Sequence, residues 1–196
     1  MKVKILSKKR ILDAFFKVDE VELQHEKFDG SMSEPMKRLN FERGDSVAAV
    51  VYNYETDSVI LTQQFRLPVY LRLNDADKAI LTEVAAGMID KGETPKDAII
   101  REVKEELGYE IVEVRLLFKF FLSPGGSSER IHLFYVEVFN NGKVAAGGGK
   151  IEENEDIKIC QITEIRRRYV FDMVEQGEIM DAKTIIGLQW LKERGI

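Results

Sequence analysis

The sequence predicts an α+β (mixed α/β) fold, and the order of its apolar segments supports this prediction. Two apolar runs, at 46–53 and 58–65, have the pattern of buried strands joined by a turn. A helix with one apolar stripe is expected at 95–107, and two more helices are expected at 163–176 and 181–193. A β-rich middle with helices inserted and appended is typical of this fold class.

The chain is expected to consist of an N-terminal β arm, residues 1–43, and a main domain, residues 44–196. Within the arm, residues 15–26 alternate imperfectly between apolar and polar side chains, and Asp29-Gly30 is a common hairpin signal. Residues 36–42 then supply the return strand. The arm is therefore expected to be a small antiparallel sheet.

The remaining segments of the main domain are assigned from the same signals. Residues 64–79 contain Pro68 and mixed polarity, which predicts a loop, and residues 80–87 predict a strand that ends at Gly87. Further strands are expected near 114–122, 130–139 and 156–162. Cys160 lies in the last of these strands, where we expect it to be a small buried side chain.

Composition excludes several classes of protein. The 44% of hydrophobic residues suffice for a core, and a net charge of −5 with no basic segment argues against nucleic-acid binding. One cysteine cannot form an internal disulfide, and no Cys/His spacing typical of zinc occurs. No signal peptide or membrane span is recognisable, so a cytoplasmic location is expected.

The helix at 95–107 carries the clearest local signals in the chain. Thr94 can cap it, Pro95 suits its first turn, and Asp97 occupies the third helical position of a capping box. Gly108 stands where a glycine commonly ends a helix. The apolar stripe that should face the core consists of Ile99, Ile100, Val103 and Leu107.

Three carboxylates lie along one edge of this helix: Glu102, Glu105 and Glu106. Glu102 and Glu106 are four residues apart, where like charges repel by a few tenths of a kcal/mol (about 0.2–0.5). A solvated acidic face is the usual explanation of such a run. A divalent cation is the alternative, because Mg²⁺ and Mn²⁺ prefer carboxylate oxygens.

The spacing around these glutamates resembles the motif of the Nudix hydrolases, G-x5-E-x7-R-E-U-x-E-E-x-G-U, in which U is usually a bulky aliphatic residue. The last U position is Tyr109 here, a mild departure. The seven fixed positions would match by chance about once in 10⁸ starting points at ordinary residue frequencies. They are occupied by Gly87, Glu93, Arg101, Glu102, Glu105, Glu106 and Gly108, with Val103 at the first U.

The resemblance implies an α/β/α sandwich that hydrolyses nucleoside diphosphates linked to another group. It implies Mg²⁺, with Mn²⁺ as a possible substitute, bound by Glu102, Glu105, Glu106 and the backbone carbonyl of Ala86. In the family, the first glutamate and the arginine of the motif pair to hold a loop against the helix; these are Glu93 and Arg101 here.

Two further segments resemble the branch that cleaves ADP-ribose, GDP-mannose and related nucleotide sugars. Pro124 lies sixteen positions after Gly108, in SPGGSSE, where Ser127 and Glu129 would contact substrate. An ordinary turn explains the two glycines of this segment equally well. In QQFRLPVY, Arg66 would grip the diphosphate and Tyr70 would stack on a base, although a surface arginine is an equal alternative for Arg66.

Another acidic cluster, at 152–156, follows the glycine segment 147–149. In the nucleotide-sugar branches, a loop here supplies a glutamate as general base or additional metal ligand, and the resemblance offers Glu153 and Glu155. Glu155 is favoured because the branches share the Glu-Asp-Ile that begins there. The glycines would let the loop close over substrate.

The resemblance also implies a homodimer formed through the arm. Two other functions stay open: hydrolysis of a different nucleotide, such as a dinucleoside polyphosphate or an oxidised nucleotide, and nucleotide binding without turnover. Pro124 argues modestly against the first, and the presence of every motif glutamate argues against the second.

Overall fold

The computed structural model describes residues 1–149 and 161–195, and the chain divides into two compact units. One unit comprises Met1–Asp45 with Phe121–Arg130. The other comprises Ser46–Phe120 with Ile131–Ile196. The boundary between an arm at 1–43 and a domain at 44–196 stays a prediction.

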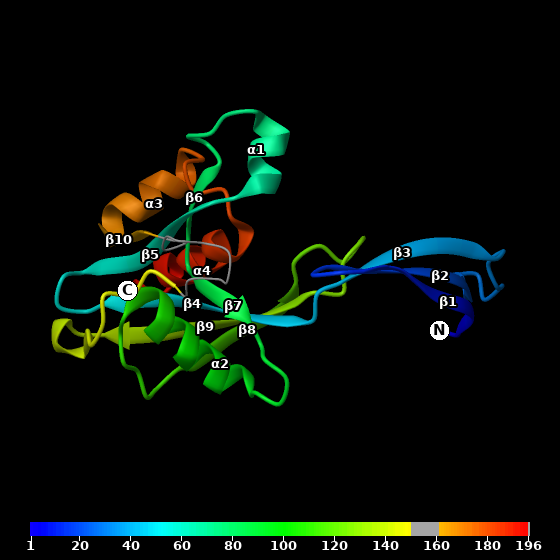
Figure 1. The fold of residues 1–196 in the computed structure, drawn as a ribbon, viewed down its shortest axis with the longest axis horizontal. Coiled ribbons are helices and arrows are strands. Elements are labelled where there is room, and N and C mark those ends of the chain that lie inside the picture. The colour runs from blue at the N-terminus through cyan, green and yellow to red at the C-terminus, as the bar shows by residue number, and fades with distance from the viewer. Residues whose placement is uncertain (150–160, 196) are drawn as a thin grey trace. The chain divides into compact units, whose positions relative to one another are not determined.

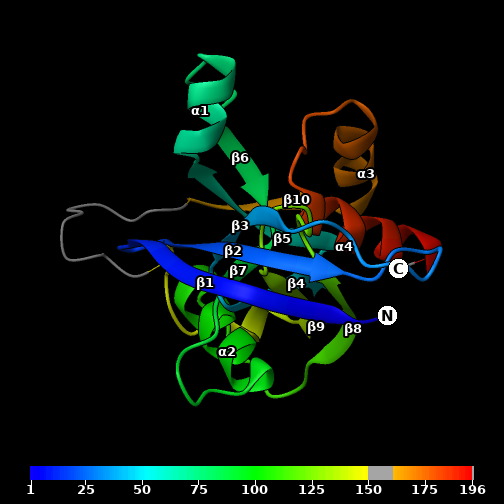
Figure 2. The same ribbon diagram turned by 90° about the vertical axis from the view of Figure 1, so that its right-hand side faces the viewer.

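The first unit contains a three-stranded antiparallel sheet in the order β1-β2-β3, seen most clearly in Figure 2. Its strands are β1 (Val3–Asp13), β2 (Lys17–His25) and β3 (Met36–Glu42). Asp19 of β2 is buried and forms hydrogen-bonded ion pairs with two residues of β1, Arg10 at 2.5 Å and Lys8 at 3.0 Å. These hydrogen bonds lower the pKa of Asp19.

Apolar side chains on this sheet are largely exposed. Sheets of so few strands are stable only when one face is buried against something else. Val3 is 59% exposed and Leu39 58%, and Ile5, Ile11 and Leu12 are about half exposed. Phe15, in the turn between β1 and β2, is 79% exposed. The arm therefore presents apolar surface that the described residues do not bury.

The second unit is built on a central sheet in the order β10-β5-β4-β9-β8, with β6 added to β5 and β7 added to β4. Strand β4 shows why both faces of this sheet must be covered. Val47, Ala49 and Val51 belong to one core, and Ala48, Val50 and Tyr52 belong to the other. The strands are β4 (Asp45–Asn53), β5 (Ser58–Phe65), β6 (Ile80–Glu83), β7 (Ala85–Met88), β8 (Arg115–Phe121), β9 (Arg130–Val138) and β10 (Gln161–Arg166).

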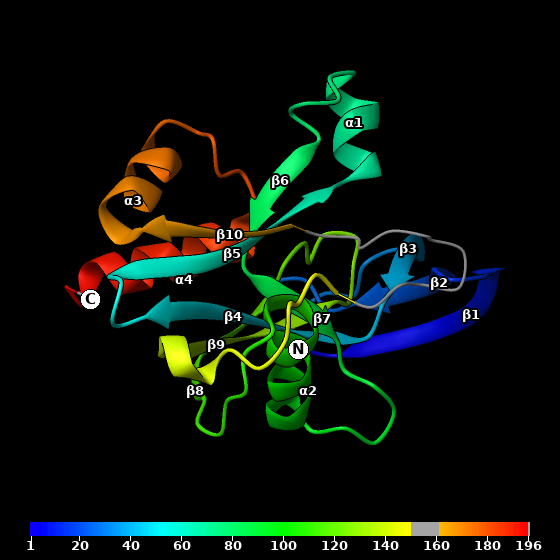
Figure 3. The ribbon, with the colours of Figure 1, turned by 60° about the vertical axis from the view of Figure 1, so that its left-hand side comes forward.

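Helices cover the two faces of this sheet separately, as Figures 1 and 3 show. Helix α2 (Pro95–Glu102) contributes Ile99 to the first core. Helices α3 (Arg167–Glu175) and α4 (Ala182–Glu193) cover the second, where Val170, Leu188 and Trp190 are buried. Helix–sheet–helix layering confirms the predicted α+β class and the α/β/α sandwich.

The segment expected as one strand at 80–87 is divided at Val84. Strand β6 pairs with β5, whereas β7 pairs with β4, with Ala86 opposite Ala48. The backbone N–H of Val84 donates instead to Thr184 Oγ1 at 2.9 Å. The chain thus changes partner strand immediately before Ala86 and Gly87.

The prediction of an irregular loop throughout 64–79 was wrong, because a helix, α1 (Leu67–Leu73), lies within it (Figure 3). Pro68 stands in the first turn, where the missing N–H costs no hydrogen bond. Asn74 ends the helix with a φ of 52°. A proline that looked like a helix breaker is here compatible with a helix start.

The prediction of a helix from Thr163 was also wrong at its start. Strand β10 continues to Arg166 and pairs with β5 from Gln161↔Gln63 to Arg166↔Ser58, so α3 begins only at Arg167. Most of the strand expected at 156–162, including Cys160, lies outside the described residues. Within the described part of the chain, every helix is too short or too polar to traverse a lipid bilayer.

Candidate active site

The helix that carries Glu102, Glu105 and Glu106, called the acidic helix below, forms where the sequence predicts it, at residues 95–107. Thr94 Oγ1 accepts from the backbone N–H of Asp97 at 3.2 Å, which caps the first turn. Val103 and Leu107 have no exposed surface, so the apolar stripe is fixed in the core. The last turn, Val103–Leu107, is π-helical, and Gly108 ends it with a φ of 79°. π-helical turns often occur at functional sites.

Arg101 contacts three of the motif glutamates, Glu93, Glu102 and Glu105. Its guanidinium donates to Glu93 through Nε and Nη2, both at 2.9 Å, and to Met88 O at 3.1 Å. Its Nη1 contacts Glu102 Oε1 at 2.6 Å and Glu105 Oε2 at 3.4 Å. The expected pairing of Glu93 with Arg101 is therefore present, and it ties the loop before the helix to the helix itself.

Gly87 of β7 makes room for Glu102. A methyl group added at Gly87 would lie 2.0 Å from Glu102 Oε1, far inside van der Waals contact. The Glu102 carboxylate therefore lies directly against the strand backbone. The first glycine of the motif is explained by this close approach of a side chain.

Glu106 reaches the same strand one residue earlier. Its Oε2 accepts from the backbone N–H of Ala86 at 3.1 Å. Burial raises the pKa of Glu106 to about 7 and the charge of Glu102 adds to the effect, whereas the Ala86 N–H and the cations Arg66 and Lys183 act in the opposite direction. Glu102 and Glu106 lie beside the same strand, and each makes ionisation of the other less favourable. A bound cation would stabilise the ionised form of both carboxylates.

The donor set fits a hard divalent cation, since it consists of carboxylate oxygens next to a strand carbonyl position. The residues described in this structure include no group of three acidic, His or Cys side chains already gathered as a metal-binding cluster. Glu102 and Glu105 are instead engaged by Arg101. Glu106 is the member of the set whose carboxylate is held by the strand rather than by Arg101.

Arg66 lies at the start of α1 and is bound to a buried acid. Its Nε and Nη2 donate to Glu83 Oε1 and Oε2 at 2.6 and 2.9 Å, a two-pronged contact that leaves Nη1 outside it. Its side chain is 40% exposed. Although burial opposes it, the hydrogen bonds of Arg66 and the charge of Lys183 lower the pKa of Glu83, so this acid is ionised.

Lys183 of α4 completes this ionic network. Its Nζ lies 2.5 Å from Glu83 Oε2 and 2.9 Å from Asp181 Oδ1. The other oxygen of Asp181 caps α4 by accepting from the N–H of Thr184 at 2.9 Å. Sequence reasoning missed Glu83 and Lys183; the only signal was one charged residue inside each of two apolar segments, ILTEVAAG and AKTIIGLQWL.

The glycine segment 147–149 contacts the far end of the acidic helix. The N–H of Gly148 donates to Glu106 O at 2.7 Å, and that of Gly149 donates to Glu105 O at 3.1 Å. A methyl group at Gly147, whose φ is 69°, would lie 2.5 Å from Glu106 O. These glycines bind the helix end, where carbonyl groups otherwise lack partners. The predicted glutamates Glu153 and Glu155 lie outside the described residues.

The other predicted substrate contacts are placed as follows. Tyr70 is on α1, with its ring 6.0 Å from that of Phe65. Ser127 and Glu129 belong to the first unit, where Ser127 Oγ donates to Phe41 O at 3.2 Å and accepts from the N–H of Glu129 at 3.1 Å. Glu129 is buried and lies 3.8 Å from Arg43. Their roles in binding stay predictions.

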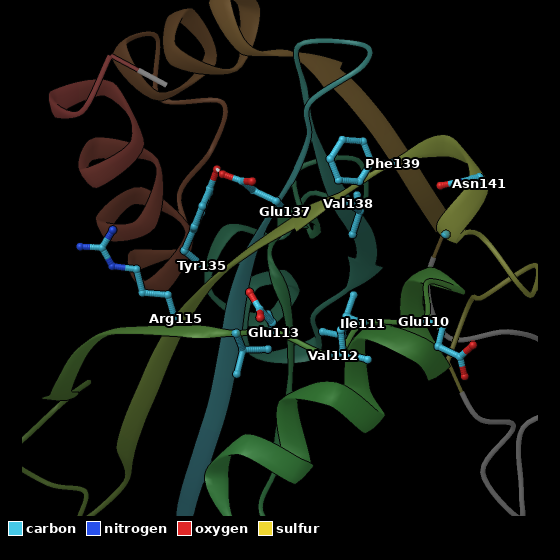
Figure 4. Close-up of a pocket in the computed structure, with 12 residues that line it drawn as sticks. Glu110, Ile111, Val112, Glu113, Arg115, Tyr135, Glu137, Val138, Phe139 and Asn141 are labelled. Carbon is cyan, nitrogen blue, oxygen red and sulfur yellow. Dashed lines mark hydrogen bonds between the residues drawn. The ribbon is translucent and has the colours of Figure 1, made fainter.

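A separate cavity of about 620 Å³ lies beside β8 and β9 (Figure 4). Three of its lining residues are acidic, namely Glu110, Glu113 and Glu137, and Arg115 is the basic one. Such a lining repels a diphosphate. None of the predicted site residues lines this cavity, so it is not the candidate active site.

Comparisons with known proteins place this arrangement in a family. A NUDIX domain model matches residues 42–178. The ADP-ribose pyrophosphatase of Haemophilus influenzae is 33% identical over 190 residues, 97% of this chain and 86% of that protein. The GDP-mannose pyrophosphatase of Shigella flexneri serotype 5b is 34% identical over 190 residues, 97% of this chain and 95% of that protein.

A solved structure described as an ADP compounds hydrolase has a similar fold, with a TM-score of 0.71 over 100% of this chain and 97% of that one, at 20% identity. The sandwich fold and the motif glutamates, together with these relatives, define the chain as a hydrolase. The chain belongs to the Nudix hydrolase family, whose members generally use divalent metal ions.

The contact between Gly87 and Glu102 leads to a prediction. We expect Gly87→Ala to displace the Glu102 carboxylate and to lower kcat/KM by about 10²-fold, the effect of losing one stabilising group in an active site. The free energy of unfolding should fall by about 1–3 kcal/mol, which still leaves the variant folded, because the end of the Glu102 side chain can move aside. Steady-state kinetics and urea unfolding measure the two effects.

Gly142→Ala is the matched control, since a methyl group there makes only ordinary contacts of 3.7 Å or more and Gly142 lies in the same unit. Equal activity of Gly87→Ala and Gly142→Ala would show that the position of Glu102 does not matter for turnover.

Proposed function

We propose that this chain hydrolyses the pyrophosphate bond of a nucleoside diphosphate sugar, ADP-ribose or GDP-mannose, and releases a nucleoside monophosphate and a sugar phosphate. The observation that carries the proposal is the placement of Glu102 and Glu106 against Ala86 and Gly87 of β7. The substrate class is supported by similarity along nearly the whole chain to proteins named for these two substrates.

Mg²⁺, or Mn²⁺ in its place, would be held by Glu102, Glu105, Glu106 and the Ala86 carbonyl. When bound, the ion supplies positive charge that binds the diphosphate and stabilises the bridging oxygen as it leaves. Arg66 adds a fixed cation, because its Nη1 side lies outside the Glu83 contact and its side chain is partly exposed. A guanidinium suits phosphate oxygens through its planar fork.

Glu155, or Glu153 in its place, acts as the general base that takes a proton from the attacking water; Glu155 also serves as an additional metal ligand. The resulting hydroxide oxygen bonds to one phosphorus, the bond from that phosphorus to the bridging oxygen breaks, and the bridging oxygen becomes part of the second phosphate. Glu105 supports the catalytic centre from the helix. Tyr70, Ser127 and Glu129 are proposed to contact the base or the sugar.

Replacement of Glu102 by Gln tests the metal site and the substrate class together. We expect wild-type chain with Mg²⁺ to release monophosphate from ADP-ribose or GDP-mannose, and Glu102→Gln to lower kcat by about 10²–10³-fold. EDTA should abolish turnover and Mg²⁺ or Mn²⁺ should restore it. A panel that also contains UDP-glucose, a dinucleoside polyphosphate and an oxidised nucleotide identifies the substrate by chromatographic detection of the nucleotide product.

Glu110→Gln is the control, because Glu110 is exposed and pairs only with Lys104 at 3.2 Å among the described contacts. Turnover of the polyphosphate or the oxidised nucleotide alone would replace the proposed substrate class. Tight binding without hydrolysis of any compound in the panel would favour a nucleotide-binding module.

The two candidate bases are separated by single substitutions. Removing a general base lowers kcat by about 10²–10⁴-fold, so Glu155→Gln is expected to show this loss and Glu153→Gln to remain within about tenfold of wild type. Kinetics at saturating Mg²⁺ measure both. The reverse order of effects would assign the base to Glu153, and two unaffected variants would remove this segment from the mechanism.

We also propose that the arm, residues 1–43, forms a homodimer, and that the enzyme is cytoplasmic. The exposed apolar residues of the three-stranded sheet support the dimer, since patches of this kind often mark protein interfaces. Light scattering at micromolar concentration should give twice the chain mass, and Leu39→Glu should shift the population towards monomer. A wild-type monomer at that concentration contradicts the dimer.

A further inference from the structure

Lys183 is a buried lysine that the mechanism so far does not use. It lies in the first turn of α4 with 11% of its side chain exposed, and its ammonium group contacts Glu83 and Asp181. Transfer of an ammonium group out of water is costly and needs a specific compensation. A lysine in this position therefore calls for a reason beyond packing.

Both of its partners have other hydrogen-bond donors besides Lys183. Asp181 caps α4 through the N–H and hydroxyl groups of Thr184. Glu83 receives both prongs of Arg66. Lys183 is therefore not required to complete the hydrogen bonding of Glu83, whereas it is the donor that the described contacts give to the second oxygen of Asp181, Oδ1. What it changes is the balance of charge in the network.

With Lys183 present, two cations face two carboxylates, so the charge of Glu83 is shared between Arg66 and Lys183. Without Lys183, the charge of Glu83 would be balanced by Arg66 alone. Arg66 would then offer little positive potential to anything on its exposed side. In a partly buried site, the loss of one nearby charge is felt strongly because water screens it poorly.

We propose that Lys183 is a positioning residue for the diphosphate of the substrate: by neutralising Glu83 from within the core, it leaves the charge of Arg66 available to the phosphate oxygens. Glu83 orients the guanidinium through Nε and Nη2, and Lys183 keeps that orienting contact from cancelling the charge. This inference rests on the proposed substrate class, because it concerns how the diphosphate is recognised.

The test measures equilibrium binding of ADP with Mg²⁺ by isothermal titration calorimetry, which does not depend on turnover. Lys183→Met is expected to weaken binding about tenfold, the effect of about 1.4 kcal/mol of lost attraction. With a hydrolysed substrate, the same variant should raise KM by a similar factor and change kcat by less than about threefold, because binding rather than chemistry is affected.

Lys192→Met is the matched control. It removes the same charge from the same helix, but Lys192 is 44% exposed and pairs with Glu175. Binding of ADP by this variant should stay within about twofold of wild type, since exposed charges are well screened. Equal weakening by both substitutions would reduce the effect to net charge of the protein and would overturn the proposal.

The double variant Glu83→Gln with Lys183→Met restores the local charge balance and keeps an acceptor for Arg66. We expect it to recover ADP binding to within about threefold of wild type. A double variant as weak as Lys183→Met alone would mean that Lys183 acts only through packing, and the proposal would be wrong. If Lys183→Met does not fold by circular dichroism, Lys183→Gln makes the same charge change with a smaller loss of hydrogen bonding.

Failure of this inference can be told from failure of the proposed function. If the wild-type chain binds ADP but releases no monophosphate from any nucleotide sugar, the proposed reaction is wrong. The role of Lys183 is then still tested by comparing the ADP affinities of wild type and Lys183→Met. If ADP binding is the same in wild type and Lys183→Met, the role of Lys183 is wrong whatever the chain hydrolyses.

Discussion

The arrangement of the acidic residues depends on Arg101. Without a cation, the three carboxylates in one and a half helical turns would repel one another, and they would also repel Glu93 in the loop that follows β7. The guanidinium of Arg101 contacts Glu93, Glu102 and Glu105 as well as Met88 O. Hydrogen bonds to Glu93 first, and then to Glu102, raise the pKa of Arg101, so this positive charge is permanent. Glu106, held by Ala86 instead, is the acid for which the protein supplies least compensation.

A second constraint is the short stretch Glu83–Gly87, which both layers of helices fix. From one face, Glu106 accepts from the N–H of Ala86 and Glu102 fills the space at Gly87. From the other face, Thr184 accepts from the N–H of Val84 and Lys183 reaches Glu83. The chain changes partner strand within this stretch, so its backbone polar groups become available to side chains from both helices. The candidate site is thereby built into the core of the sandwich.

Local signals were sufficient for the parts of the fold that depend on neighbouring residues. The cap at Thr94, the stripe through Val103 and the end at Gly108 are all encoded within one helix, and the sequence motif pointed to its glutamates. The helix α1 was missed because proline is common both in loops and in the first turn of a helix, so Pro68 alone does not distinguish the two. The extent of β10 was missed because its pairing with β5 is set by residues about a hundred positions away.

The network of Arg66, Glu83 and Lys183 was beyond sequence reasoning for the same reason. One charged residue in an apolar strand and one in an apolar helix give no sign that they meet, and only the packing of α4 on the sheet brings Lys183 to Glu83. The contact of the glycine segment 147–149 with the helix end was likewise unpredicted. The sequence predicts that these glycines let a loop close over substrate, which stays a prediction, and it gave no sign that Gly148 and Gly149 donate hydrogen bonds to the carbonyl groups of Glu106 and Glu105.

The ion pair between Glu83 and Lys183 spans 100 positions of the chain, and this separation has a consequence for biosynthesis. A ribosome delivers the motif helix and its strand well before α4. Until α4 emerges and docks, Glu83 faces Arg66 alone and Val84 lacks the acceptor that Thr184 provides. A nascent chain can therefore possess every motif glutamate while the network of Arg66, Glu83 and Lys183 is unfinished, and completion of that network coincides with closure of the second core.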